Sequence, residues 1–171
     1  MLQIYHGNGK GKTTASVGLA VRAAGAGMNV MFMQFLKNGK SSEINVLKNI
    51  NGITVMCCDV CNKFTFQMNE NEINETASRH NFMLESAFKA LSERKTDMVI
   101  LDEFLDAYNK KMLDGSLSEK LIFTFSDTAE IILTGRSPDK IFIDRADYIS
   151  LITSEKHPFD IGVKARYGIE C

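Results

Sequence analysis

The chain has 171 residues, with 20 basic and 21 acidic side chains, a formal net charge of −1 and 44% hydrophobic residues. This size predicts one compact domain over residues 1–171, and the charge balance argues against a nucleic-acid-binding surface. No segment reaches the about 18 uninterrupted apolar residues that a membrane span needs. Because Met1 leads directly into an apolar run, we expect no signal peptide, no membrane partner and a cytoplasmic location.

Apolar runs alternate with helical patterns along the chain. In chain order the predicted elements are a strand over 2–6, a helix over 13–26, a strand over 30–35, a helix over 41–49, a strand over 53–57, a helix over 70–94, a strand over 97–102, a helix over 117–125 and strands over 129–134 and 148–152. This alternation predicts an α/β fold with a mostly parallel sheet and helices on both faces. An irregular tail is expected from about residue 154.

The longest predicted helix carries an apolar stripe. Its members recur at spacings of three, four or seven residues: Ile73, Ala77, Leu84, Phe88 and Leu91. Residues at these spacings share one helix face. We interpret the stripe as core packing.

A glycine-rich loop separates the first strand from the first helix. It reads Gly7-Asn8-Gly9-Lys10-Gly11-Lys12-Thr13, so the first glycine falls one place later than in the strict phosphate-loop pattern. The glycines permit positive φ, successive amides form an anion nest, and the helix directs its positive end to the same place. Lys12, helped by Lys10, supplies charge for phosphates, and the Thr13 hydroxyl is suited to Mg²⁺. The loop predicts a Mg-ATP site on a fold of the P-loop NTPase type. The alternative is a flexible glycine turn with solvated lysines.

Polar residues follow two other buried strands. Asp102 and Glu103 come directly after an apolar run, and Arg136 follows another in Thr134-Gly135-Arg136. The carboxyl ends of parallel strands meet at one edge of a sheet, where ligands gather. We therefore expect Asp102 or Glu103 to hold magnesium, directly or through water, and Arg136 to reach a phosphate. Taken alone, each group also fits a solvated turn.

Four cysteines occur: Cys57, Cys58, Cys61 and Cys171. Cys58 and Cys61 have the spacing of half a zinc site, but the sequence offers no second pair. We expect reduced thiols in or near a strand end, and a zinc site is the open alternative.

The sequence resembles the P-loop type of ATP:corrinoid adenosyltransferase over nearly its whole length. The phosphate loop with Thr14 and Ala15 carries this resemblance, as do further blocks: Arg22-Ala23-Ala24-Gly25, Gln34-Phe35-Leu36-Lys37, Leu101-Asp102-Glu103, Leu133-Thr134-Gly135-Arg136 and Ala146-Asp147. Residues 156–170, KHPFDIGVKARYGIE, are the most specific match. The resemblance implies that Gly7 to Thr14, Arg22 and Arg136 bind ATP, with Lys12 also catalytic.

The resemblance also implies an unusual reaction. A cobalt(I) corrinoid such as cob(I)alamin attacks the 5′-carbon of ATP, and triphosphate leaves intact. Members of the family place an aromatic motif, Phe-Thr-Trp, under the corrinoid ring, and Phe64 and Phe66 occupy its two aromatic positions here. Phe66 replaces the tryptophan, and Cys61-Asn62-Lys63 replaces the small residues that usually precede the motif. Without the resemblance, two such aromatics would more often mark one face of a strand.

The implied partners are ATP, the corrinoid, a flavoprotein or other reductant, and a second copy of the chain in a homodimer. Two other classes remain open on the residues alone. A P-loop kinase or ATPase would cleave at the γ-phosphate and release ADP. A nucleotide-dependent switch or nucleic-acid motor would need a basic stripe, which the charge balance disfavours.

Overall fold

A six-stranded parallel sheet forms the centre of the protein. The computed structural model describes residues 1–63 and 65–169. The strands are β1 (Leu2–His6), β2 (Val30–Gln34), β3 (Ile53–Cys57), β4 (Met98–Asp102), β5 (Glu130–Gly135) and β6 (Tyr148–Leu151). Their order is β3-β2-β4-β5-β1-β6, and each neighbouring pair is parallel. All carboxyl ends therefore lie at one edge, where β1, β4 and β5 bring their following loops together.

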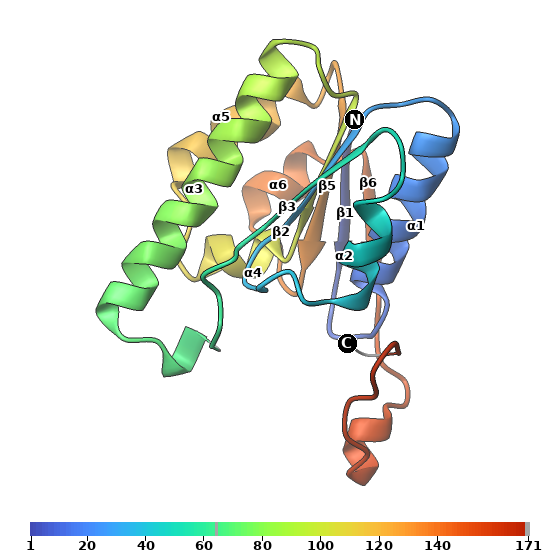
Figure 1. Ribbon diagram of the computed structural model, residues 1–171, viewed down its shortest axis with the longest axis vertical. Helices are drawn as coiled ribbons and strands as arrows, with labels where there is room; N and C mark the ends of the chain where they lie inside the picture. The colour runs from blue at the N-terminus through green and yellow to red at the C-terminus, as the bar shows by residue number, and fades with distance from the viewer. Residues whose placement is uncertain (64, 170–171) are drawn as a thin grey trace.

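Helices cover both faces of the sheet (Figure 1). The α-helices are α1 (Lys12–Gly25), α2 (Ser42–Leu47), α3 (Glu70–Ser92), α4 (Phe104–Asn109), α5 (Gly115–Phe125) and α6 (Lys140–Arg145). Two 3-10 helices, η1 (Thr65–Gln67) and η2 (Pro158–Ile161), follow β3 and β6. In Figure 1, α1 and α2 lie on one side of the sheet, and α3 to α6 lie on the other. This arrangement confirms the predicted α/β class.

The predicted strands agree with the structure to within one residue at each end, but two helices were missed. α4 and α6 have six residues each and lie in segments for which no element was predicted. A helix of fewer than two turns shows little apolar periodicity, although α2, which is equally short, was predicted. The tail after β6 contains η2 and is otherwise irregular.

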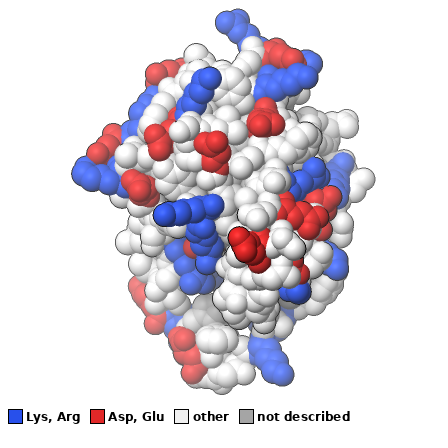
Figure 2. Space-filling model, turned by 90° about the vertical axis from the view of Figure 1, so that its left-hand side faces the viewer, with Lys and Arg blue, Asp and Glu red and all other residues white. Residues whose placement is uncertain are grey.

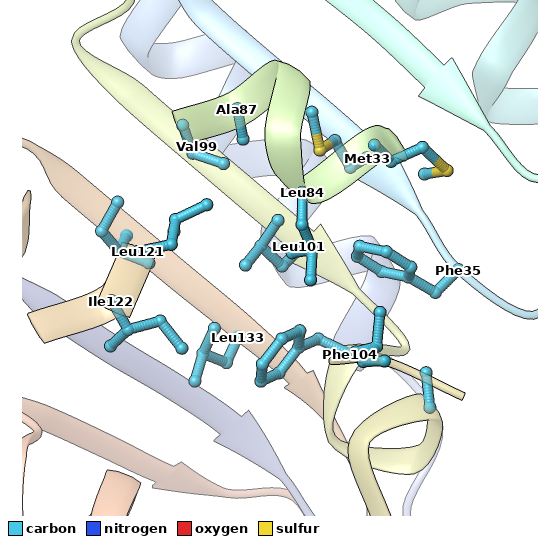
Figure 3. Packing of buried hydrophobic residues seen from close by; sticks show 14 of the residues in the cluster. Met33, Phe35, Leu84, Ala87, Val99, Leu101, Phe104, Leu121, Ile122 and Leu133 are labelled. Atoms are coloured by element: carbon cyan, nitrogen blue, oxygen red, sulfur yellow. The ribbon is translucent and has the colours of Figure 1, made fainter. Parts of the chain in front are cut away.

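The larger core lies between the sheet and α3, α4 and α5 (Figure 3). Figure 3 shows Leu84 and Ala87 of α3 directed at Val99 and Leu101 of β4. β4 is buried along its whole length, which accounts for its unbroken apolar run. The stripe predicted for α3 is partly wrong, because Ile73 is 38% exposed. The buried face instead comprises Thr76, His80, Met83, Leu84, Ala87 and Leu91.

The molecular surface carries a mixture of charges. On the face drawn in Figure 2, basic and acidic side chains are interspersed over much of the surface. Among the described residues, no helix is both long and apolar enough to cross a bilayer.

Candidate nucleotide site

The glycine-rich loop connects β1 to α1 at the carboxyl edge of the sheet. Gly7 and Gly11 have φ values of 113° and 117°, which L side chains rarely adopt. Gly11 precedes α1, whose first amides have no partner within the helix. The loop thus directs the positive end of α1 into the open space beside the sheet.

The loop is held by the residues that directly follow β5 and β6. The amide of Gly7 donates to the carbonyl oxygen of Arg136 at 3.1 Å, and the amide of Gly9 donates to that of Ile152 at 2.9 Å. These two amides therefore already have partners inside the protein, so the amides left for the expected anion nest are the others of the loop. The amides at the start of α1 are the ones placed to bind an anion.

Gly7 is required by close packing as well as by its backbone conformation. A Cβ atom at this position would lie 2.3 Å from the carbonyl oxygen of Ile152. Gly18 is the opposite case, because it lies within α1 and a Cβ there would meet nothing within 4 Å.

We expect Gly7→Ala to lower the melting temperature, since the substitution combines a strained φ with a backbone overlap. Gly18→Ala is the matched control and should raise the unfolding free energy by about 0.5–1 kcal/mol, because alanine is the better helix former. Thermal unfolding of both variants by circular dichroism checks the pair. A Gly7→Ala variant as stable as the parent would contradict the packing at the loop.

Asp102 lies at the centre of a polar cluster that joins three strand ends. Its Oδ1 accepts hydrogen bonds from the hydroxyls of Thr13, at 2.9 Å, and Thr134, at 2.7 Å. Its Oδ2 accepts one from Nε2 of Gln34 at 3.1 Å. The carboxylate is fully buried. The first helix, β2, β4 and β5 are thereby tied together at one carboxylate.

Lys37 is a site residue that the sequence analysis did not nominate. Its Nζ lies 3.6 Å from Oδ2 of Asp102 and 3.4 Å from Oε1 of Glu103. Burial alone would lower the pKa of Lys37, but the two carboxylates outweigh burial and raise it. Burial raises the pKa of Glu103, and Lys37 opposes that rise. Its place in the sequence, shortly after the end of a buried strand, could have indicated that Lys37 belongs to the site.

A cavity of about 820 Å³ opens beside the loop. Its lining includes the loop from Asn8 to Thr14, Lys37 and Glu103. The segment after β6 supplies the opposite wall through residues that include His157, Phe159 and Lys164. Lys12 folds back over the loop, with its Nζ 2.8 Å from the carbonyl oxygen of Gly9. The cavity therefore combines cationic groups and a helix amino terminus with an apolar wall, which suits a polyphosphate attached to a flat ring.

The oxygen ligands that magnesium prefers are present at this position. The hydroxyl of Thr13 and the carboxylate of Asp102 are in direct contact, and Glu103 follows on the cavity side. Since Thr13 touches Asp102, that carboxylate is better placed than Glu103 to share an ion with Thr13. The residues thus fit the expected cation.

Comparison with known proteins now decides the family. A model of the family described as ATP:corrinoid adenosyltransferase BtuR/CobO/CobP matches residues 1–171. The chain belongs to this family. It is therefore a transferase that moves the adenosyl group of ATP to a corrinoid.

Similar proteins agree with the family and the fold. Corrinoid adenosyltransferase CobA of Salmonella typhimurium is 34% identical over 170 residues, covering 98% of this chain and 83% of the relative. Corrinoid adenosyltransferase of Escherichia coli K12 is 34% identical over 173 residues, with the same coverage. The crystal structure of KaiC-like protein PH0186 from Pyrococcus horikoshii OT3 has a TM-score of 0.55 at 14% identity, covering 91% of this chain and 74% of that one. At this identity it shows the fold alone, which agrees with the predicted α/β class.

Two arginines predicted for the adenosyltransferase site lie outside the cavity lining. Arg22 is in the last turn of α1. At 1.5 Å per residue it stands about 15 Å from Lys12 along the helix, too far to share its phosphate. Arg136 lies beside the loop through its backbone, and its amide donates to Oδ2 of Asp106 at 2.9 Å. The position of Arg22 therefore does not support its role as a ligand of ATP bound to the same chain.

The aromatic motif of the adenosyltransferase follows β3. Phe64 lies outside the described residues. Phe66 is in η1, so the strand alternative is wrong, and its side chain is 81% exposed. Asn62, just before the motif, accepts a hydrogen bond at 3.4 Å from Asn38, which follows Lys37. The aromatic segment is therefore joined to the loop that carries Lys37.

The expectation of reduced thiols is wrong for two of the cysteines. Cys58 and Cys61 form a disulfide, with a Cα–Cα distance of 5.5 Å, while Cys57 is free. The tight turn after β3 brings the two sulfurs together, and the amide of Cys61 donates to the carbonyl oxygen of Cys58 at 3.2 Å. His80 of α3 lies beside them, and its burial lowers its pKa to about 4. This imidazole is consequently neutral at neutral pH.

Proposed function

We propose that this adenosyltransferase binds Mg-ATP in the cavity beside the glycine-rich loop and uses the loop to hold triphosphate as a leaving group. The cobalt(I) electron pair attacks the 5′-carbon of ATP and forms the cobalt–carbon bond. The bond from that carbon to the triphosphate oxygen breaks, and its electron pair leaves with the triphosphate. Cobalt is formally oxidised to cobalt(III), so the step needs no further oxidant.

The contact between Thr13 and Asp102 carries this proposal. It fixes the start of α1 against the end of β4, so that the helix amides and Lys12 face one cavity. Negative charge grows on the leaving triphosphate, and preorganised amides and Lys12 stabilise it there. Magnesium, when bound by Thr13 and Asp102, adds Lewis-acid stabilisation of the same charge. No side-chain nucleophile is required, because the corrinoid supplies the attacking atom.

Analysis of the products tests the proposal against the kinase or ATPase alternative. The protein is mixed with Mg-ATP and chemically reduced cobalamin. We expect a light-sensitive cobalt–carbon product and one triphosphate for each corrinoid consumed. Release of ADP or inorganic phosphate in place of triphosphate would instead mean cleavage at the γ-phosphate.

The exposed Phe66 is proposed to contact the face of the corrinoid. An aromatic group there lowers the polarity around cobalt and disfavours the ligated, more charged oxidised state. We expect Phe66→Ala to slow adenosylation that starts from cobalt(II), while the reaction of pre-reduced cobalt(I) is largely kept. The two rates, measured by absorbance, check the split.

Phe123→Ala is the matched control for Phe66, since Phe123 is a partly exposed phenylalanine on α5. It should leave both rates near those of the parent. An equal loss with cobalt(II) and cobalt(I) substrates in Phe66→Ala would mean that Phe66 does not govern the reduction.

We further infer that the enzyme is a homodimer in the cytoplasm and receives electrons from a flavoprotein or other reductant. The edge strand β6 supports the homodimer, because its apolar residues Tyr148, Ile149 and Leu151 are 55%, 45% and 62% exposed. An apolar edge strand commonly needs a cover. Sedimentation equilibrium at micromolar concentration measures the mass, and a monomer would contradict the dimer.

A further inference from the structure

The loop after β3 and the middle of α3 bring three metal-ligating side chains together. The donor atoms of Cys58, Cys61 and His80 lie within 4.8 Å of one another. The three side chains are 0%, 4% and 0% exposed. Two come from a Cys-x-x-Cys turn and the third from a helix 19 residues after Cys61. Buried thiols and an imidazole in this combination are the ligands of zinc sites.

The orientation of His80 suits metal binding. Its Nδ1 lies 3.3 Å from the carbonyl oxygen of Met112, so this nitrogen carries the proton and donates. Nε2 is therefore the unprotonated nitrogen; it accepts from the amide of Leu36 at 3.2 Å and lies 3.7 Å from Sγ of Cys61. A histidine that ligates a metal nearly always donates its other ring N–H to such an oxygen.

The distance between one of the sulfurs and the imidazole also fits a tetrahedral ion, while the two sulfurs must separate when the disulfide is reduced. With a sulfur at about 2.3 Å and a nitrogen at about 2.0 Å from zinc, the two ligand atoms are about 3.5 Å apart. The observed distance between Sγ of Cys61 and Nε2 of His80 is 3.7 Å. Asp59 within the turn pairs with Arg79, the neighbour of His80, at 2.9 Å, which fixes the turn against α3.

Charge balance favours a divalent ion in this position. The edge of the Phe35 ring lies against His80, with centroids 5.1 Å apart, and the cluster is part of the apolar core. Two thiolates and one neutral imidazole carry a charge of −2, so a divalent cation leaves no net charge in the core. The sequence has no second cysteine pair, and His80, one of its three scattered histidines, approaches the two cysteines only in the folded protein.

We propose that the dithiol form of the protein binds one zinc ion through Cys58, Cys61 and His80, at a site separate from the corrinoid and from Mg-ATP. The disulfide and the metal exclude each other, because both use the same sulfurs. A thiol or phosphine reductant supplies two electrons to the disulfide, and two protons make two thiols. Zinc then replaces those two protons. Three protein ligands leave a fourth position for water.

One hydrogen bond links the proposed metal site to the loop beside the nucleotide cavity. The amide of Leu36 donates to Nε2 of His80 at 3.2 Å. Zinc takes that lone pair, so the Leu36 amide loses its acceptor. Because Leu36 precedes Lys37, occupancy of the site is coupled to the loop beside Asp102.

Metal titration of corrinoid-free protein tests the proposal independently of adenosyl transfer. The protein is reduced with a phosphine, freed of metal and titrated with Co²⁺ as a spectroscopic probe, then with Zn²⁺. We expect one ion per chain, with thiolate-to-cobalt charge-transfer bands that zinc abolishes. Cys58→Ser, Cys61→Ser and His80→Gln should each weaken binding by more than the about 10–100-fold that the loss of an outer partner costs.

Cys57→Ser is the matched control, because Cys57 is the adjacent free cysteine. It should keep one ion per chain and the same bands. Thiol alkylation of the parent protein keeps the test decisive if a ligand variant fails to fold: zinc should protect two thiols and leave Cys57 reactive. Absence of metal uptake by fully reduced parent protein, or uptake that is lost only in Cys57→Ser, would overturn the proposal.

Discussion

Replacement of Lys12 by alanine is expected to lower kcat/KM for adenosyl transfer by at least about 100-fold, the usual loss when one preorganised charge-stabilising donor is removed. Lys12 begins α1 and its Nζ lies over the loop, 2.8 Å from the carbonyl oxygen of Gly9. In this position it meets the charge that develops on triphosphate. Initial rates with pre-reduced cobalamin and varied Mg-ATP measure the loss.

A matched lysine shows whether the effect is local. Lys89→Ala removes an exposed lysine near the end of α3, away from the cavity lining, and should leave the rate unchanged. Lys10→Ala should have an intermediate effect, because Lys10 also lines the cavity. If Lys12→Ala and Lys89→Ala had equal rates, the loop would not hold the leaving group.

Replacement of Asp102 by asparagine is expected to remove the magnesium dependence of ATP binding and to lower the unfolding free energy by about 1–3 kcal/mol. The carboxylate accepts from Thr13, Thr134 and Gln34 and neutralises Lys37. An asparagine keeps the shape but replaces an acceptor by an N–H donor and removes the charge. Calorimetric titration of ATP with and without Mg²⁺, together with thermal unfolding, measures both effects.

Glu103→Gln separates the two acidic residues. Glu103 lines the cavity but makes no recorded contact with Thr13, so its substitution should preserve the magnesium dependence and most of the stability. The reverse result, with magnesium dependence lost only in Glu103→Gln, would assign the ion to Glu103. That outcome would contradict the role derived from the contact between Thr13 and Asp102.

The central strands of the sheet were predictable because they are buried on both faces. The run from Met98 to Asp102 is apolar until its last residue, which is typical of a central parallel strand. The position of α3 along the chain was predicted, but the helix face that turns toward the core was not. Its sequence offers overlapping apolar stripes, and the choice between Ile73 and His80 depends on what packs against the helix.

The parts of the candidate nucleotide site that were predictable are those whose residues directly follow or end a strand. The glycine loop follows the end of β1 and leads to Thr13 in the first turn of α1, and Asp102 ends β4. Parallel topology brings these two strand ends together. Three features of the site depend on how distant segments pack: the contact of Lys37 with Asp102, the cavity wall formed by the tail, and the distance of Arg22 from the loop. His80 illustrates the same limit, since it meets Cys61 only after α3 docks on the sheet.

The pairing of the last strand with the first has a consequence for synthesis on the ribosome. β6 lies beside β1, and the carbonyl oxygen of Ile152 receives the amide of Gly9. A nascent chain in which these late residues are still inside the exit tunnel has the glycine loop but lacks its support. Tight ATP binding should consequently begin only after β6 and Ile152 have left the exit tunnel and paired with β1 and the loop.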